Sequence, residues 1–392
     1  MTALPSLKAH FSRSLAGGGT QLHLAAHSHH LWPDASFTGH MAAWQDAARV
    51  WDGKWRHVFG QVIPAAQRHI ARLLNLPDPS TIAFAPNTHD FLRRLLSACP
   101  AGRPARVLTT DGEFHTLTRQ LNRLREDGLV EVTVLPVRPF ATFAERFAQA
   151  AKAPFDLVFI SQVFFNSGWA LPDLASLVDA VASPDALVVI DGYHGFMARP
   201  TGLSAIQHRA FYLSGGYKYA MAGEGVCFMH CPPGIAPRPR DTGWYASFGA
   251  LATAKPGEVP YGTDGSRFLG ATFDPSGLYR FNAVQDWLAG LGIGVADIHA
   301  HAHAVAAAFV ADVDRLHCPG LREARLAVPM TDSQRGNFLA YDSADSQALH
   351  NMLSDAGIVT DVRGSVLRIG FGVYHDIADV PGIVDRIAAA VT

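Results

Sequence analysis

The stretch that decides the fold is residues 211–230, FYLSGGYKYAMAGEGVCFMH, in which two runs of strand-forming residues flank a glycine-rich turn. Between the run at 211–216 and the run at 225–230 there is no room for the crossover helix that parallel neighbouring strands require. The two strands are therefore predicted to be antiparallel. The turn between them holds Lys218 between two tyrosines, in a chain that otherwise uses lysine sparingly.

Upstream of this stretch, from about residue 107, short β-rich runs alternate with amphipathic runs. The predicted strands are 106–111, 130–137, 156–162 and 186–192, and the predicted helices between them are 114–127, 142–153 and 171–183. Such alternation is typical of a parallel sheet covered by helices. The sequence thus predicts an α/β fold whose sheet is mostly parallel, with one antiparallel strand.

The domain organisation follows from where this alternation stops. Residues 231–243, CPPGIAPRPRDTG, are irregular and rich in proline, as at a domain boundary or an active-site loop. Two long predicted helices and an alternating tail come after it, which indicates an α+β domain. We therefore expect an N-terminal segment at 1–50 that packs near the active site, a large domain at 51–275 and a small domain at 276–392.

The composition limits the classes of function. Apolar residues make up 48% of the 392 residues and charged residues 17%, with a net charge of -2. Neither disorder nor a nucleic-acid partner is expected from these values. No run reaches the ~18 apolar residues of a membrane span, so no membrane association is expected and the cytoplasm is the expected location. The few scattered cysteines predict neither a disulfide framework nor a metal site.

Ionisable side chains stand at the predicted carboxyl ends of two strands. The run at 186–192 reaches Asp191 and is followed by His194, and the next strand leads into Lys218. Ligands of open α/β sheets bind at this edge. An aspartate there can also be a cap, and a turn lysine can simply be solvated. The flanking aromatic rings instead favour a desolvated amine, which is a nucleophile toward carbonyl groups.

A further feature is the stretch 84–99, in which Asn87 and Thr88 open a predicted helix. Free amides at a helix N-terminus beside a hydroxyl suit a phosphate, although the same pair is also an ordinary cap. A carboxylate, an amine nucleophile and a phosphate site at one edge match the ring nitrogen, the aldehyde and the phosphate of pyridoxal 5′-phosphate. The sequence therefore predicts this cofactor.

With these residues in place, the chain resembles the aminotransferase class V branch of the fold-type I pyridoxal-phosphate enzymes, and most of all kynureninase. The resemblance runs from about Leu24 to Val380 and rests on LAAHSHHLWP, on Asp191-x-x-His194 with Tyr217-Lys218, on GATFDPSGLYR and on LRIGFGVYHDIADV. It implies a mostly parallel seven-stranded sheet with helices on both faces, a smaller α+β C-terminal domain, and a homodimer with shared active sites.

The resemblance also implies roles toward the cofactor. Lys218 would bond to the aldehyde and later move protons at the substrate α-carbon, and Asp191 would pair with the ring nitrogen. His194 would support the ring hydroxyl or a proton transfer. The remaining contacts would come from Thr88 and His89 at the phosphate, Phe114 stacked on the ring, Tyr217 and Trp244 as further donors, and Thr272 reaching the phosphate of the partner subunit.

Toward an amino-acid substrate, the resemblance implies that Arg368 clamps the carboxylate in a bidentate fashion. The histidine-rich segment LAAHSHHLWP replaces a glycine-bearing segment of the family, so His30 and Ser28 are expected to contact the substrate. The segment SQVFFNSG lacks the polar pattern usual in kynureninases and offers Asn166 in its place.

The implied reaction is hydrolytic cleavage of the bond between the β and γ carbons of a kynurenine-type amino acid, giving an anthranilate-type product and alanine, with Tyr217 as the acid. Thr272 stands about where kynureninases use an asparagine, which leaves the substrate open. The alternative is a class V aminotransferase or a β-eliminating lyase on another amino acid. A cysteine desulfurase is disfavoured, because Cys318 precedes the loop where that reaction needs its thiol. A non-catalytic binding module is disfavoured, because both Lys218 and Asp191 are present.

Overall fold

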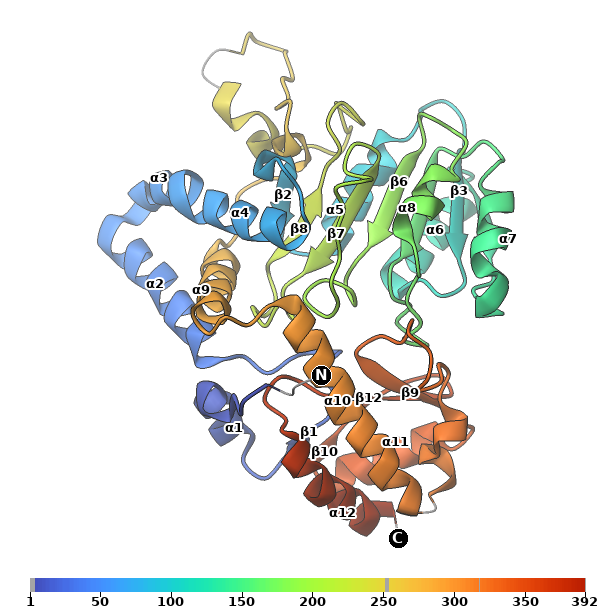
Figure 1. The fold of residues 1–392 in the computed structure, drawn as a ribbon. Helices are drawn as coiled ribbons and strands as arrows, with labels where there is room; N and C mark the ends of the chain where they lie inside the picture. Colours follow the sequence, from blue (N-terminus) through green and yellow to red (C-terminus); the bar gives the residue numbers. More distant parts are fainter. Residues whose placement is uncertain (1–3, 251–253, 317, 392) are drawn as a thin grey trace.

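The computed structural model describes residues 4–250, 254–316 and 318–391, which form a large α/β unit with a smaller unit beside it (Figure 1). A seven-stranded sheet lies at the centre of the large unit. Its strands follow the order β2 (Ile82–Ala85), β8 (Cys227–His230), β7 (Ala210–Gly215), β6 (Leu187–Asp191), β5 (Leu157–Ser161), β3 (Ala105–Thr110) and β4 (Val130–Leu135). Only β8 is antiparallel to its neighbours. The expected fold class and the antiparallel pair are confirmed.

Helices cover both faces of this sheet. One face packs against α5 (Thr88–Ala98) and α6 (His115–Glu126), and the other against α4 (Ile63–Leu73), α7 (Phe143–Ala150) and α8 (Leu174–Asp179). Every residue of β5 and β7 is buried. Because both faces are covered, these strands read as continuous apolar runs rather than as an alternation of apolar and polar residues.

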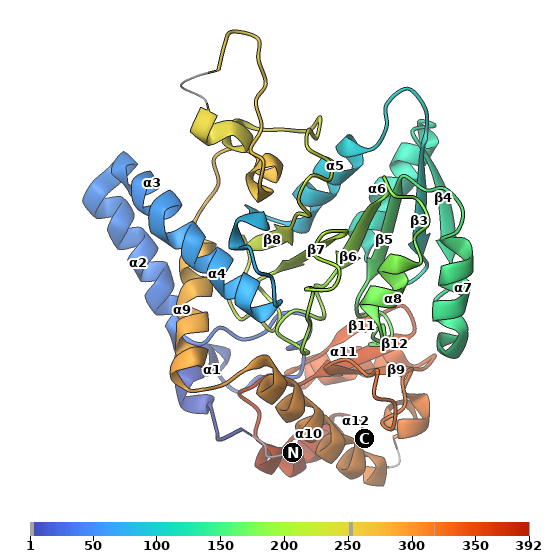
Figure 2. The ribbon, with the colours of Figure 1, turned by 45° about the horizontal axis from the view of Figure 1, so that its top comes forward.

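The smaller unit is an α+β domain. Its antiparallel sheet has the order β11 (Asp361–Arg363), β12 (Val366–Gly370) and β9 (Phe338–Asp342), and β1 (Leu22–His23) pairs separately with β10 (Ile358–Val359). Its helices are α10 (Val295–Val313), α11 (Ser346–Asp355) and α12 (Val380–Val391). The domain lies against one end of the large sheet in both views (Figures 1 and 2).

A group of N-terminal helices lies beside the large sheet. The group comprises α2 (Asp34–Val50) and α3 (Lys54–His57), and α2 packs along α9 (Ser276–Gly290), whereas α1 (Ser12–Gly18) lies by the small domain (Figure 2). The apolar side chains of α9 belong to the core of the large unit, while β1 belongs to the sheet region of the small one. The hydrophobic core of the large unit therefore continues across residues 275 and 276, where the boundary between the two domains was expected.

Short helical turns complete the described chain. They are η1 (Lys8–Phe11), η2 (Trp51–Gly53), η3 (Val58–Val62), η4 (Pro79–Thr81), η5 (Phe140–Thr142), η6 (Trp244–Ala250), η7 (Gly265–Phe268), η8 (Asp314–Leu316), η9 (Pro319–Leu321), η10 (Glu323–Arg325) and η11 (Ile377–Asp379). No single helix in the described ranges is long and apolar enough to cross a membrane. Only α9 taken together with 295–316 meets those criteria, and the two are bent by 83°.

The close contact between α2 and α9 can be tested by adding one methyl group. A Cβ atom at Gly39 would lie 2.5 Å from the carbonyl oxygen of Tyr279 and 3.0 Å from the Cβ atom of Ala283. Gly39→Ala should lower the free energy of unfolding by about 1–3 kcal/mol in urea denaturation, because neither backbone can move away cheaply. The control is Gly290→Ala in α9, where nothing lies within 4 Å of the added atom. Equal stabilities of the two variants would contradict the packing.

Candidate active site

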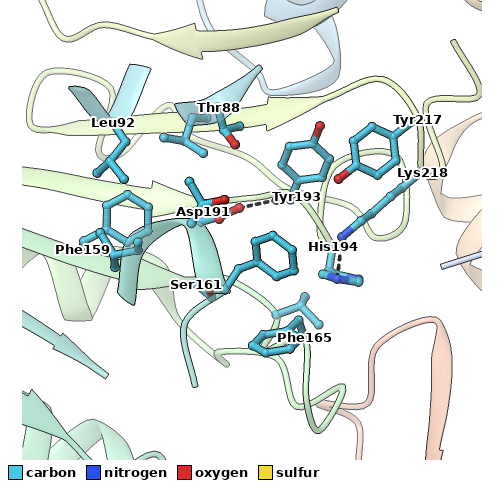
Figure 3. A pocket seen from close by; sticks show the side chains of 15 residues that line it. Thr88, Leu92, Phe159, Ser161, Phe165, Asp191, Tyr193, His194, Tyr217 and Lys218 are labelled. Atoms are coloured by element: carbon cyan, nitrogen blue, oxygen red, sulfur yellow. Dashed lines mark hydrogen bonds between the residues drawn. The ribbon is translucent and has the colours of Figure 1, made fainter. Parts of the chain in front are cut away.

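Asp191 and Lys218 face one cavity at the carboxyl end of the large sheet. Asp191 is the last residue of β6, and Lys218 lies in the turn that follows the adjacent strand β7. The cavity has a volume of about 600 Å³, part of it open to solvent, and is also lined by Tyr193, His194 and Tyr217 (Figure 3). The structure thus brings together the carboxylate, the amine and two further side chains that the sequence singled out.

The amine of Lys218 is withdrawn from water. The residue is 8% exposed, and its Nζ atom lies 2.6 Å from Nε2 of His194. The ring centroids of Tyr193 and Tyr217 lie 4.9 Å and 5.9 Å from the amine. Burial and the positive charge of Arg368 lower the pKa of Lys218 to about 7, against the opposing effect of nearby carboxylates. Burial also holds the pKa of His194 well below its usual range, so a neutral imidazole meets the amine.

Asp191 is oriented by the backbone that follows it. Its Oδ1 atom accepts a hydrogen bond from the backbone N–H of Tyr193 at 2.8 Å (Figure 3). Burial raises the pKa of Asp191, and the positive charge of Lys218 acts in the opposite direction. A protonated ring nitrogen placed against this carboxylate would stabilise its charged form in the same way.

The turn that carries the lysine is fixed from both domains. Arg280 of α9 is buried and donates hydrogen bonds to two carbonyl oxygens within residues 222–224. From the other side, the hydroxyl of Tyr219 lies 2.9 Å from the carbonyl oxygen of Asn337 and 2.8 Å from that of Phe371, both in the small domain. The position of the lysine is therefore coupled to the seating of the small domain.

Only one of the two residues expected to bind the cofactor phosphate lines the cavity. Thr88 is the first residue of α5 and lines the cavity, and Asn87 caps the helix by accepting a hydrogen bond from the backbone N–H of Asp90 at 3.0 Å. His89, expected beside Thr88, is exposed and lines a separate surface groove along α6. Its side chain does not reach the site, because successive helical residues point about 100° apart.

An aromatic face is available at the mouth of the cavity. Phe114 precedes α6, lines the cavity and remains 39% exposed, so it is not a core residue of the helix. Its ring meets the ring of Phe165 edge-on at 5.4 Å, and the ring of His115 lies at the same distance from Phe165. The free face of Phe114 can stack on a flat heteroaromatic ring.

Trp244 and Thr272 do not line this cavity. Both are exposed, and Trp244 packs on Tyr245 with their ring centroids 4.2 Å apart. The expected contact of Trp244 with the cofactor is therefore not formed within one chain, because the segment after β8 leads away from the site. The contact of Thr272 with the cofactor of a partner subunit stays a prediction.

Arg368 is buried on β12 and already engaged. Its Nη1 atom donates to the carbonyl oxygen of Phe165 at 2.7 Å, and its Nη2 atom is bonded to the carboxylate of Asp361. Each terminal nitrogen keeps a second N–H, so the bidentate clamp expected from the sequence stays a prediction. Among the three side-chain nitrogens of Arg368, Nε alone has no hydrogen-bond partner within the described residues.

The expected substrate contacts of the N-terminal segment also require correction. His30 is buried away from the cavity, with Nδ1 donating to the carbonyl oxygen of Leu31 at 2.7 Å and Nε2 accepting from the backbone N–H of Val373 at 3.3 Å. Leu31 and Val373 engage the two ring nitrogens, so neither is free for a substrate. Ser28 and Asn166 are half-buried and do not line the cavity.

Two other histidines of this segment lie beside the site: the ring of His29 stacks on that of Tyr217 with centroids 4.8 Å apart, and the second is the buried His27. Its ring stacks on Phe338 with centroids 4.7 Å apart and lies 6.5 Å from the ring of His194. The segment is not a regular element, so its sequence does not show which of its histidines turns toward the lysine.

Glu113 is a residue of this edge that was not expected from the sequence. Its carboxylate accepts hydrogen bonds from the hydroxyls of Thr110 at 2.7 Å and Ser161 at 2.6 Å, and Ser161 lines the cavity. Burial raises the pKa of Glu113 to about 7. Its position could have indicated it, because an acidic residue between β3 and Phe114 follows the carboxyl end of a strand, at the edge of the sheet that holds the site.

The residues on this edge fit pyridoxal 5′-phosphate. Within the described chain the amine of Lys218 has only His194 as a hydrogen-bond partner, which leaves it able to bond to an aldehyde. Asp191 would meet the ring nitrogen, Phe114 would cover a ring face, and Thr88 with the first amides of α5 would hold the phosphate. The donor set has a group for each part of the cofactor.

The family model for aminotransferase class V matches residues 53–381. Isopenicillin N epimerase of Streptomyces clavuligerus is 30% identical over 175 residues, which are 43% of this chain and 43% of that protein. The chain thus matches less than half of the length of that relative.

Solved structures extend the likeness over the whole chain. A cysteine desulfurase of Thermococcus onnurineus NA1 has a TM-score of 0.80 and 13% identity, covering 100% of this chain and 99% of that one. The cysteine desulfurase CsdA of Escherichia coli has a TM-score of 0.76 and 17% identity, covering 98% and 97%. The cystine C-S lyase C-DES has a TM-score of 0.77 and 18% identity, covering 95% and 98%. Such identities show the fold alone, whereas the family match spans most of the sequence. The chain belongs to the aminotransferase class V family, and its cofactor is pyridoxal 5′-phosphate.

Proposed function

We propose that this chain is a kynureninase-like hydrolase that cleaves the bond between the β and γ carbons of an amino acid with an aryl ketone side chain. The observation that carries the proposal is the Tyr217 phenol, which lines the same cavity as Lys218 beneath an aromatic mouth. The coarser conclusion, a pyridoxal-phosphate enzyme acting on amino acids, does not depend on this choice.

The residues around the cavity have separate tasks in such a reaction. Bound pyridoxal phosphate supplies an aldehyde for the amine and a ring that draws electrons from the substrate α-carbon. Lys218, with a pKa of about 7, carries a large uncharged fraction at neutral pH and can take the α-proton. His194 orients the amine from 2.6 Å, and the carboxylate of Asp191 favours a proton on the ring nitrogen.

Tyr217 fits the role of proton donor. Burial raises the pKa of Tyr217 to about 12, so its phenol keeps its proton at neutral pH. Hydrolysis adds one water to the γ-carbonyl, breaks the bond between the β and γ carbons and returns a proton to the β-carbon. The products are alanine and an aryl carboxylic acid, and one water balances the reaction.

The mouth of the cavity supports an aromatic substrate. Phe114 and Phe165 meet edge-on, and His115 adds a third ring against Phe165. Rings in this arrangement can hold the edge or the face of an aryl group at the entrance.

The cysteines give no support to a desulfurase reaction, the activity named for two of the structural neighbours. Cys99, Cys227 and Cys231 are buried, and burial raises the pKa of each thiol to about 12. Cys318 is half-buried in the small domain and does not line the cavity. Sulfur transfer requires a reactive thiolate, and such thiolates have low pKa values and accessible positions.

A β-eliminating lyase is the second candidate. Removal of the α-proton by Lys218 is sufficient for elimination, and no water has to be placed at a γ-carbonyl. Much of the cavity wall is apolar, with Leu92, Leu117, Val163 and Leu213 among its residues. The fold likeness to the lyase C-DES agrees with this candidate. An aminotransferase reaction would agree with the name of the family.

The proposal predicts the products formed from kynurenine. The cofactor-loaded protein, incubated with kynurenine or 3-hydroxykynurenine, should release alanine and the matching anthranilate in equal amounts, as measured by liquid chromatography. Pyruvate and ammonium from β-chloroalanine, with no aryl product from kynurenine, would favour the lyase. Glutamate formed at the expense of 2-oxoglutarate would identify an aminotransferase. Absence of any anthranilate rejects the hydrolase.

Tyr217→Phe should lower kcat by about a hundredfold or more, the usual loss when a positioned acid is removed, while the cofactor stays bound. The measurement is steady-state kinetics beside the visible spectrum of the bound cofactor. Tyr341→Phe is the control, since Tyr341 is buried in the small domain and its hydroxyl has no hydrogen-bond partner among the described residues. Unchanged turnover by the Tyr217 variant would remove the phenol from the mechanism.

The lowered pKa of Lys218 predicts how cofactor attachment depends on pH. Only the uncharged amine attacks an aldehyde, so the rate of attachment to the cofactor-free protein should rise with pH and be half-maximal near the pKa of about 7. Stopped-flow absorbance of the cofactor measures this rate. Lys218→Ala should show no such absorbance change. A midpoint close to the ordinary lysine value of 10.5 would show that the amine is not desolvated.

A further inference from the structure

Glu113 is a buried carboxyl group with no cation beside it. The residue is 3% exposed, and within the described chain its hydrogen-bond partners are all uncharged, while its charged neighbour is another acid, Asp191. Buried charges in folded proteins are paired with an opposite charge or are lost by a change of protonation. Burial raises the pKa of Glu113 to about 7, so both its charged and its protonated form are populated at neutral pH.

The two oxygens of this carboxyl group differ in what they accept. Oε1 accepts hydrogen bonds from the hydroxyl of Thr110 at 2.7 Å and from the backbone N–H of Ser161 at 3.1 Å. Among the described residues Oε2 accepts only from the hydroxyl of Ser161, at 2.6 Å. A proton taken up by Glu113 therefore belongs on Oε2, because Oε1 already receives two donors.

Protonation at Oε2 reverses one hydrogen bond. A hydroxyl has a single O–H to donate, and while Glu113 is charged the O–H of Ser161 points to Oε2. Once Oε2 carries a proton, Glu113 donates and the oxygen of Ser161 accepts. The O–H of Ser161 is then released to another acceptor, so its direction follows the charge of Glu113.

Asp191 is the acceptor that stands beside Ser161. The two residues are partners on the neighbouring parallel strands β5 and β6, with Cα atoms about 4.8 Å apart. Both line the cavity (Figure 3). Oδ1 of Asp191 accepts from the backbone N–H of Tyr193, whereas Oδ2 has no hydrogen-bond partner among the described residues. A Ser161 hydroxyl that turns away from Glu113 can therefore donate to Oδ2.

We propose that Glu113 is a positioning residue that turns the Ser161 hydroxyl away from or toward Asp191, and thereby sets how firmly Asp191 keeps a proton on the ring nitrogen of the cofactor. With Glu113 charged, the hydroxyl points away and a second negative charge also favours a positive ring. With Glu113 protonated, the hydroxyl stabilises the Asp191 carboxylate, which then attracts the ring proton less. The inference rests on the cofactor and not on the proposed reaction.

Few other ionisable groups surround Glu113. Asp191 faces it from β6, and its negative charge adds to burial in raising the pKa of Glu113. Asp111 and His115, its neighbours in the chain, are both exposed. Across the cavity lie Tyr193, His194, Tyr217 and Lys218. A rise in pH through about 7 should therefore charge Glu113 and strengthen the hold on the ring proton.

The test compares binding of pyridoxal 5′-phosphate with that of its 1-deaza analogue, in which a C–H replaces the ring nitrogen and no proton can be held. The ratio of the two dissociation constants, from absorbance titrations of the cofactor-free protein, measures the gain from the ring proton. At a pH about one unit above the pKa of Glu113, Glu113→Gln should lower this preference by about tenfold, the size of one hydrogen bond to a charged group. One unit below that pKa, the natural protein and the variant should differ much less.

The double variant Glu113→Gln with Ser161→Ala separates the hydroxyl from the charge. The glutamine amide donates to the Ser161 oxygen as the protonated acid does, so removal of that hydroxyl should recover part of the lost preference. Asp111→Asn is the control, because it makes the same chemical change on an exposed neighbour and keeps the oxygen that accepts from the backbone N–H of Val137. It should leave the preference unchanged.

Infrared difference spectra of the cofactor-free protein give a second readout. Acidification through about pH 7 should produce the carbonyl band of a protonated carboxyl group, and Glu113→Gln should lack that band. Absence of the band in the natural protein would overturn the proposal. So would an unchanged preference in Glu113→Gln at the higher pH, or a double variant no better than Glu113→Gln alone. Failure of the proposed reaction leaves these results unaffected, since no substrate is used.

Discussion

The chemistry of the site depends on the burial of the Lys218 amine away from water. Burying an ammonium group costs several kcal/mol, so the folded protein favours the uncharged amine that the chemistry needs. The short turn from β7 to β8 places it there, with aromatic rings on its flanks and His194 against it. Arg280 and Tyr219 then fix the turn from the two domains, and this couples cofactor attachment to the assembly of both.

Much of the large domain was predictable because its signals are local. The turn at 217–224 is too short for a crossover, so the antiparallel strand followed from chain length, and Asp191 and Lys218 followed from their places at strand ends. Missed elements had weaker signals. β1 has two residues, too few to show alternation, and α2 buries only Ser36 and Gly39, so its sequence carries no continuous apolar stripe.

The substrate side was less predictable, because it depends on contacts between distant segments. Family resemblance located Arg368, but its pairing with Asp361 depends on the register of β11 against β12. Likewise His27 and His30 are equivalent in sequence, and the space over Gly370 decides which of them approaches Arg368. A glycine on a distant strand thus leaves the space in which a histidine of residues 27–30 lies.

The pairing of β1 with β10 sets the order in which the molecule can fold. Residues 22–23 are synthesised long before their partners at 358–359. The large sheet uses strands between residues 82 and 230 and can form while the chain is still growing. The contacts of the N-terminal histidines with the small domain form late, because they join residues that lie far apart in the sequence. The N-terminal histidines therefore reach their places beside the small-domain sheet only after residues 358–370 have been made.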